Sequence, residues 1–110
     1  MDVATGVRVF KQYIQPLGQQ GYTLGSPCTT SAPNGFDWMT QFFQQCGSDD
    51  CGVVEVPIHW YDVKFEDFKT YINKWAGFGK PMRVTEFACQ VCISLFDFLI
   101  TAALTAYMHV

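Results

Sequence analysis

A chain of 110 residues is long enough for one small domain with a hydrophobic core. Its net charge of -3 and its lack of a basic run argue against a nucleic-acid-binding protein. Charged residues make up only 15% of the chain, well below the share of about a quarter in ordinary soluble domains. Such a surface is poorly solvated unless a partner or a ligand covers part of it.

Helix-like and strand-like segments alternate along the sequence. Apolar residues at a spacing of 3.6 indicate the helices, and runs rich in Val and Ile indicate the strands. In chain order, the predicted elements are a helix over 2–17, a strand over 22–27, a helix over 36–46, a strand over 53–61, a helix over 65–78 and a strand over 82–88. Asp2 is placed to cap the first helix. This α-β-α-β-α-β order predicts an α/β fold with about three parallel strands.

The predicted strand ends carry the residues with chemical potential. Parallel α/β folds keep functional groups at the C-terminal ends of their strands. Glu86 stands at one such end, either as an acid or nucleophile or as a solvated, ion-paired carboxylate. His59, Trp60 and Tyr61 close the neighbouring strand. An aromatic ring covers the apolar face of a sugar while imidazole and phenol groups bond its hydroxyls, although a lone His is also common as a structural residue.

Three segments around these residues form a specific set by their order and spacing. They read "GYTLGSPCTTSAPNGFDWMTQFF", "CGVVEVPIHWYDVKFEDFKTYI" and "GKPMRVTEFACQ". Together they resemble the glycosyl hydrolase catalytic core of glycoside hydrolase family 128, whose fungal and bacterial members cleave β-1,3-glucan. The resemblance covers residues ~5–90 and implies a partial TIM (β/α)8 barrel, from about the fourth helix to the seventh strand.

The resemblance also implies a role for each candidate residue. Glu86 would be the nucleophile of a retaining endo-β-1,3-glucanase, and His59, Trp60 and Tyr61 would line the glucan cleft. The implied partner is β-1,3-glucan or a related polysaccharide of the fungal cell wall, with no cofactor and no metal. Members of the family are secreted or associated with the cell wall, but no apolar signal segment opens this sequence, so it assigns the chain to no compartment.

One part of the family pattern is missing. Retaining hydrolysis needs a pair of carboxyl groups about 5–5.5 Å apart. The family carries its acid/base Glu in an Asn-Glu-Pro motif, which this sequence lacks, and neither Glu55 nor Glu66 is placed to replace it. We therefore expect a fragment that keeps the nucleophile and is nearly inactive alone. A non-catalytic β-glucan-binding remnant is the alternative.

The cysteines allow two structural interpretations. Cys46 and Cys51 flank a polar turn and are predicted to form a disulfide in an oxidising compartment, or to remain thiols in the cytosol. With Cys89 and Cys92 they could instead supply a four-thiolate zinc site, which the spacing of the first pair disfavours. The odd count of five cysteines leaves one unpaired.

The sequence divides at Gln90 into a catalytic-type part, 1–90, and an apolar tail, 91–110. The tail carries one charge, Asp97, and is long enough to cross the ~30 Å core of a bilayer as a helix. A small membrane-tethered protein is thus another hypothesis, though membrane contact is not favoured. An apolar core helix and a translated intron are the other interpretations of this segment.

Overall fold

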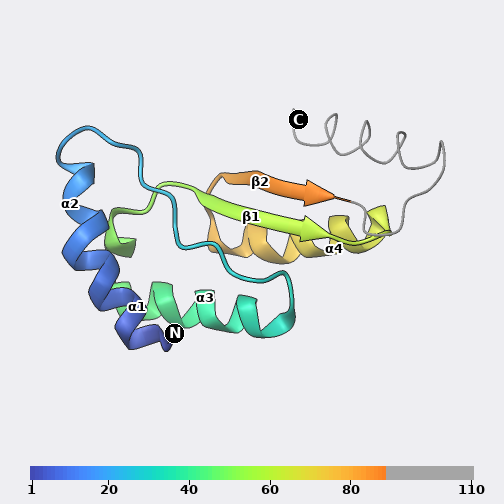
Figure 1. The fold of residues 1–110 in the computed structure, drawn as a ribbon, viewed down its shortest axis with the longest axis horizontal. Helices are drawn as coiled ribbons and strands as arrows, with labels where there is room; N and C mark the ends of the chain where they lie inside the picture. Colours follow the sequence, from blue (N-terminus) through green and yellow to red (C-terminus); the bar gives the residue numbers. More distant parts are fainter. Residues whose placement is uncertain (89–110) are drawn as a thin grey trace.

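The computed structural model describes residues 1–88 of the chain (Figure 1). Its elements in chain order are α1 (Val3–Val9), the π-helical turn η1 (Phe10–Ile14), α2 (Gln15–Gly18), α3 (Pro33–Cys46), the 3-10 turn η2 (Asp50–Gly52), β1 (Val56–Tyr61), α4 (Phe65–Trp75), the 3-10 turn η3 (Ala76–Phe78) and β2 (Met82–Ala88). The predicted tail helix, the boundary at residue 90, Cys89 and Cys92 lie outside the described residues. Within residues 1–88, no helix combines the length and apolar character needed to cross a membrane.

The N-terminal helix is continuous from α1 to α2 but widens by a π-helical turn. The Thr5 backbone N–H donates to Oδ1 of Asp2 over 2.8 Å, so Asp2 caps the helix as predicted. Pro16 has no N–H, and its ring would clash with the carbonyl four residues earlier. Just before it, the N–H of Gln15 donates to the carbonyl of Phe10, five residues back. The π turn is therefore a local response to Pro16.

The segment 22–27, predicted as a strand, makes a single bridge to the other described residues. It runs beside the start of β1 and pairs in parallel through Gly25 and Glu55. The N–H of Ser26 donates to the carbonyl of Glu55 over 3.0 Å. Glycine weakens a strand and Pro27 has no N–H to continue the ladder, so regular pairing ends there. The described sheet thus has two strands instead of the predicted three.

β1 and β2 pair in parallel, joined by α4 and η3, which cross one face of the sheet (Figure 1). Alternate residues of β1 are buried against the helices: Val56, Ile58 and Trp60. The residues between them, 57 and 59, are only partly buried, and Tyr61 is exposed. The core lies between this sheet face and the helices, and its largest fully buried side chains are Trp75, Phe42, Phe68, Met39, Ile58 and Val56.

The pairing of the two strands slips by one residue halfway along. Ile58 pairs with Val84, but His59 pairs with Glu86, so Thr85 is an extra residue in β2. Its Oγ1 donates to the carbonyl of Ile58 over 3.5 Å. Without this bulge Glu86 would pair with Trp60 and share its helix-facing side. The bulge therefore turns Glu86 to the face that carries His59.

Cys46 and Cys51 form a disulfide across the turn between α3 and β1. This confirms the predicted pairing and leaves neither residue as a thiolate ligand for zinc. Among residues 1–88, no group of three or more His, Cys, Asp or Glu side chains is arranged to hold a metal ion.

The hydroxyl of Tyr71 is a buried polar group in the core. Its ring packs between those of Trp60 and Trp75, with centroids 5.0 Å and 5.2 Å away. Within the described part of the chain, the hydroxyl has no hydrogen-bond partner. Burial raises the pKa of Tyr71 far above its usual range, with a smaller contribution from Cys28. A buried donor without a partner costs about 1–3 kcal/mol of stability.

We expect Tyr71→Phe to raise the free energy of unfolding by about 1 kcal/mol, because it removes the unpaired hydroxyl and keeps the ring. Tyr13→Phe is the matched control, since Tyr13 is exposed and its hydroxyl is already solvated. Urea denaturation of both variants measures the effect. A loss of stability in Tyr71→Phe would show that the hydroxyl finds a partner in solution.

Candidate functional site

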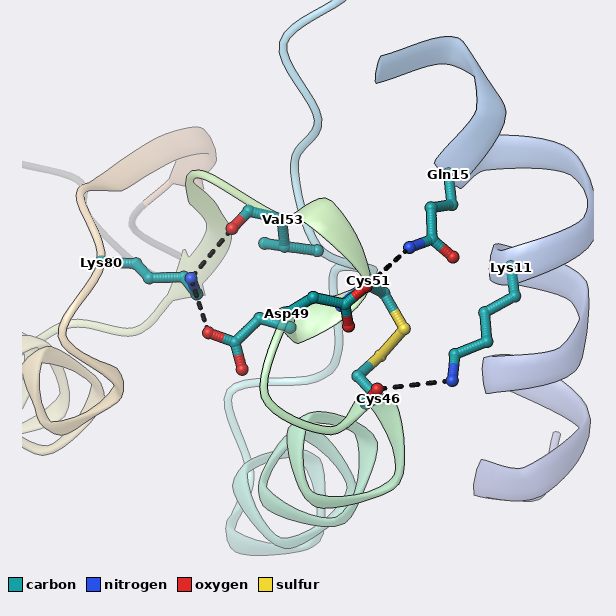
Figure 2. The surroundings of a disulfide bond; sticks show 8 residues. Lys11, Gln15, Cys46, Asp49, Cys51, Val53 and Lys80 are labelled. Atoms are coloured by element: carbon teal, nitrogen blue, oxygen red, sulfur yellow. Dashed lines mark hydrogen bonds and ion pairs between the residues drawn. A yellow bond between two sulfur atoms is a disulfide. The ribbon is translucent and has the colours of Figure 1, made fainter. Parts of the chain in front are cut away.

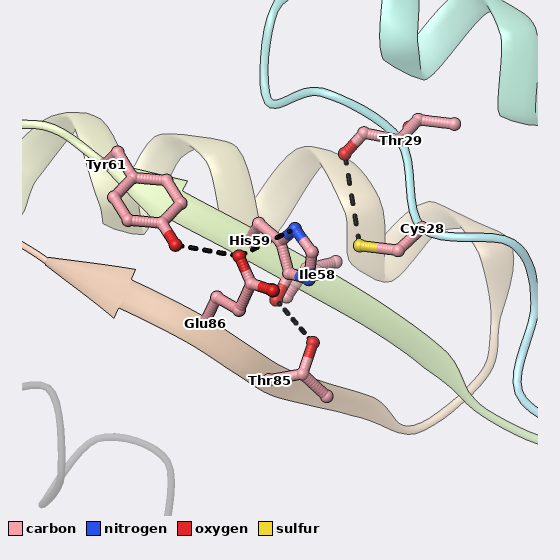
Figure 3. A network of polar contacts seen from close by, with 7 residues as sticks. All are labelled: Cys28, Thr29, Ile58, His59, Tyr61, Thr85 and Glu86. Atoms are coloured by element: carbon pink, nitrogen blue, oxygen red, sulfur yellow. Dashed lines mark hydrogen bonds and ion pairs between the residues drawn. The ribbon is translucent and has the colours of Figure 1, made fainter.

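Three polar side chains meet where β1 and β2 end, on the sheet face turned away from the helices (Figure 3). The hydroxyl of Tyr61 donates to Oε2 of Glu86 over 2.7 Å. Nδ1 of His59 lies 3.4 Å from the same oxygen. The structure thus brings together three of the four residues singled out in the sequence.

The geometry leaves one oxygen of the carboxylate for other partners. Both contacts are made to Oε2 of Glu86, and Oε1 takes part in neither. The Glu86 side chain is 52% exposed, so it is open to a ligand from solvent. The hydrogen bond to Glu86, more than desolvation or the carboxylate charge, raises the pKa of Tyr61 above its ordinary value. Tyr61 is the hydrogen-bond donor in this contact, and Glu86 is the acceptor.

Trp60 lies on the opposite face of the sheet from this cluster. It is only 9% exposed and packs against Phe68 and Tyr71, with ring centroids 5.5 Å and 5.0 Å away. An edge of it borders a cavity of about 210 Å³ that also touches Asp67 and Lys74 of α4. Adjacent residues of a strand point to opposite faces. The structure therefore does not bring Trp60 to Glu86.

The other two glutamates of the sequence are paired elsewhere. Nη2 of Arg83 lies 2.9 Å from Oε2 of Glu55, nearer the start of the two strands. Oε2 of Glu66 pairs with Lys69 on α4 over 3.1 Å. Neither carboxylate contacts the Glu86 cluster, so the described residues present Glu86 without a second glutamate beside it.

Cys28 is a neighbour of the cluster that the sequence reasoning missed. It follows Pro27 in the loop before α3, and Figure 3 shows it on the opposite side of His59 from Tyr61. Burial, and then the charge of Glu86, raises the pKa of the Cys28 thiol. It is therefore a protonated thiol and a weak nucleophile at neutral pH. Its position directly after a predicted strand end was the available signal.

Cys28 also borders a cavity that is larger than the one beside Trp60. This cavity, of about 380 Å³, lies between the loop and α3, and Asn34 and Trp38 contribute to its wall. Trp38 stacks on Phe42 with ring centroids 5.6 Å apart. The Trp38 ring is thus fixed by the core, and the cavity has a rigid aromatic wall.

Comparison with known proteins shows which family and which proteins the chain resembles. Residues 1–100 match the family model described as "Glycosyl hydrolase catalytic core". The chain is 37% identical over 91 residues to alkali-sensitive linkage protein 1 of Schizosaccharomyces pombe. That match covers 81% of this chain and 16% of the yeast protein.

Solved structures share the fold. The chain is similar to a GH128 subgroup VI exo-β-1,3-glucanase from Aureobasidium namibiae, with a TM-score of 0.87 and 17% identity, over 97% of this chain and 44% of that one. It is also similar to a GH128 subgroup VII oligosaccharide-binding protein from Trichoderma gamsii, with a TM-score of 0.67 and 34% identity. That match covers 81% of this chain and 34% of the Trichoderma gamsii protein. The chain thus spans less than half of each relative, and the described α/β arrangement is consistent with part of a barrel.

The Tyr61–Glu86 contact makes a prediction about titration. We expect Glu86→Gln to lower the pKa of Tyr61 toward the ordinary tyrosine value, because an amide oxygen accepts a weaker bond and carries no charge. NMR of the assigned Tyr61 ring as a function of pH measures the shift. Glu66→Gln, on the exposed side of α4, is the control. An unchanged Tyr61 titration in Glu86→Gln would show that the contact is not formed in solution.

Proposed function

The chain belongs to the glycosyl hydrolase catalytic core family, and on that premise we propose that it supplies the nucleophile side of a β-1,3-glucan cleft. The observation that carries the proposal is the convergence of Tyr61 and His59 on one oxygen of Glu86, at the ends of parallel strands. The names of the GH128 relatives point to β-1,3-glucan and oligosaccharides as the ligand class. The cluster occupies the strand ends, where barrel enzymes keep their active sites.

In the proposed mechanism Glu86 attacks the sugar through Oε1. Tyr61 and His59 hold Oε2 and fix the plane of the carboxylate. A bond forms between Oε1 and the anomeric carbon while the glycosidic bond breaks and its oxygen takes a proton from a general acid. Water then releases the sugar from Glu86. The described residues bring no second glutamate to Glu86, so the acid would come from elsewhere in a complete cleft.

His59 and Tyr61 also suit the binding of sugar hydroxyls. His59 faces Glu86 through Nδ1, which leaves Nε2 directed elsewhere and available to a sugar hydroxyl. Tyr61 is 43% exposed and offers the edge and face of its ring beside Glu86. Trp60 has no part in this proposed site, because it faces the helices.

Binding without hydrolysis is a second candidate function. The relative that is 34% identical is described as an oligosaccharide-binding protein, whereas the exo-β-1,3-glucanase is 17% identical and shares the fold alone. In a binding site of this kind, Glu86 accepts hydrogen bonds from sugar hydroxyls, and the same Tyr61 and His59 contacts keep it oriented.

Retention on insoluble β-1,3-glucan and release of reducing ends from a laminarin-type glucan test the two functions together. We expect the chain to be retained and Tyr61→Ala to reduce retention by roughly tenfold, since a polar contact to a ligand is worth about 1–2 kcal/mol. Hydrolysis by the isolated chain should be weak, because loss of a general acid costs about 10²–10⁴ in rate.

Matched variants separate the outcomes. Glu86→Gln should abolish any residual hydrolysis, and Glu66→Gln should change neither readout. Retention that survives in Glu86→Gln, with no turnover by either protein, favours the binding function. Failure of the chain both to bind and to hydrolyse the glucan would reject both functions.

A further inference from the structure

The turn between α3 and β1 is strained and held closed by several contacts (Figure 2). Three successive residues have positive φ angles: Asp50 at 48°, Cys51 at 54° and Gly52 at 75°. This left-handed conformation is tolerated by Gly and Asp but is uncommon for a residue such as Cys51, and it costs backbone energy there. The Cys46–Cys51 disulfide closes the turn, and Oδ1 of Asp49 accepts from the N–H of Cys51 over 3.1 Å.

Lys80 connects this turn to the start of β2. Its ammonium lies 2.9 Å from Oδ2 of Asp50 and donates to the carbonyl of Val53 over 2.9 Å. The Lys80 side chain is only 16% exposed, so water screens these contacts less than those of a surface pair. One residue further on, the carbonyl of Pro81 accepts from the N–H of Val56 over 2.8 Å. Side chain and backbone thus join the turn to both strands.

The N-terminal helix holds the other side of the turn. The ammonium of Lys11 donates to the carbonyl of Cys46 over 3.3 Å. Nε2 of Gln15 donates to Oδ2 of Asp49 over 3.1 Å. The disulfide turn therefore stands between the first helix and the entry of β2, with polar contacts to both (Figure 2).

We propose that the Cys46–Cys51 turn is a redox-sensitive joint that acts through Lys80 on the entry of β2, and so on the placement of Glu86. The position of β2 against β1 is set where Val56 pairs with Met82, directly after Lys80 and Pro81. A slip of one residue there would move Glu86 to the other face of the sheet. The inference concerns the fold, and it holds whether the site hydrolyses glucan or only binds it.

The chemical step is the reduction of the disulfide by a dithiol. The dithiol attacks one sulfur and is oxidised to its own disulfide, while Cys46 and Cys51 take up two electrons and two protons and become thiols. The turn then loses the bond that closes it, and its positive φ angles are free to relax. Asp50 and Val53 move with the turn, so Lys80 loses its fixed partners.

Amide hydrogen exchange on the full chain, oxidised and treated with dithiothreitol, tests this joint. We expect reduction to accelerate exchange of the Val56 amide about tenfold, and Lys80→Met in the oxidised protein to do the same. Lys80→Arg should keep more of the protection than Lys80→Met does, because it retains the charge and N–H donors although its planar head group is larger. Lys69→Met, which removes a pair confined to α4, is the control. Lys80→Met should also shift the NMR resonances of the His59 ring.

The combined effect of reduction and Lys80→Met shows whether the disulfide acts on β2 through Lys80 or stabilises only its own turn. If disulfide and Lys80 act in series, Lys80→Met adds little to exchange once the protein is reduced. Faster exchange confined to the end of α3 and the turn, with Val56 unchanged, would overturn the proposal, as would independent, multiplying effects of reduction and Lys80→Met. Should reduction unfold the chain, Lys80→Met in the oxidised protein decides alone. It must then accelerate Val56 exchange more than Lys69→Met does, or the proposal fails.

Discussion

The one-residue slip in the pairing of β1 with β2 determines on which side of the sheet Glu86 stands. Pairing begins with Val56 opposite Met82, and the bulge at Thr85 changes the parity of every later residue in β2. Glu86 then lies opposite His59 and within reach of Tyr61. The polar cluster thus depends on two features of the backbone: the residue at which β2 begins to pair with β1, and the position of the β-bulge in β2.

The start of β2 in turn depends on residues far from the cluster in sequence. Lys80 contacts the disulfide turn, and that turn contacts the first helix through Lys11 and Gln15. A small sheet of two described strands has little ladder of its own to resist sliding. The polar and covalent contacts at the start of the strands therefore help to fix the register of β2 against β1. In a larger sheet, neighbouring strands also fix that register.

Much of this architecture was readable from the sequence, and the exceptions have physical causes. Periodicity predicted three helices and both paired strands, and the quoted segments correctly indicated a family 128 relationship. Periodicity does not report hydrogen-bond partners, so the π turn before Pro16 and the single bridge at Gly25 were missed. Trp60 was grouped with His59 because they are adjacent in sequence, although adjacent strand residues face opposite ways.

The alternation within β1 also bears on how this sequence can change over evolutionary time. Ile58 and Trp60 are locked in the core, so drift at these positions is limited by packing. Positions 59 and 61 project from the other face and contribute little to the packing of the core. Substitutions there change the polar contacts of the strand end without disturbing the packing of the core. One six-residue strand thus interleaves two sets of residues: Val56, Ile58 and Trp60 are constrained by packing, whereas His59 and Tyr61 are constrained by their contacts with Glu86.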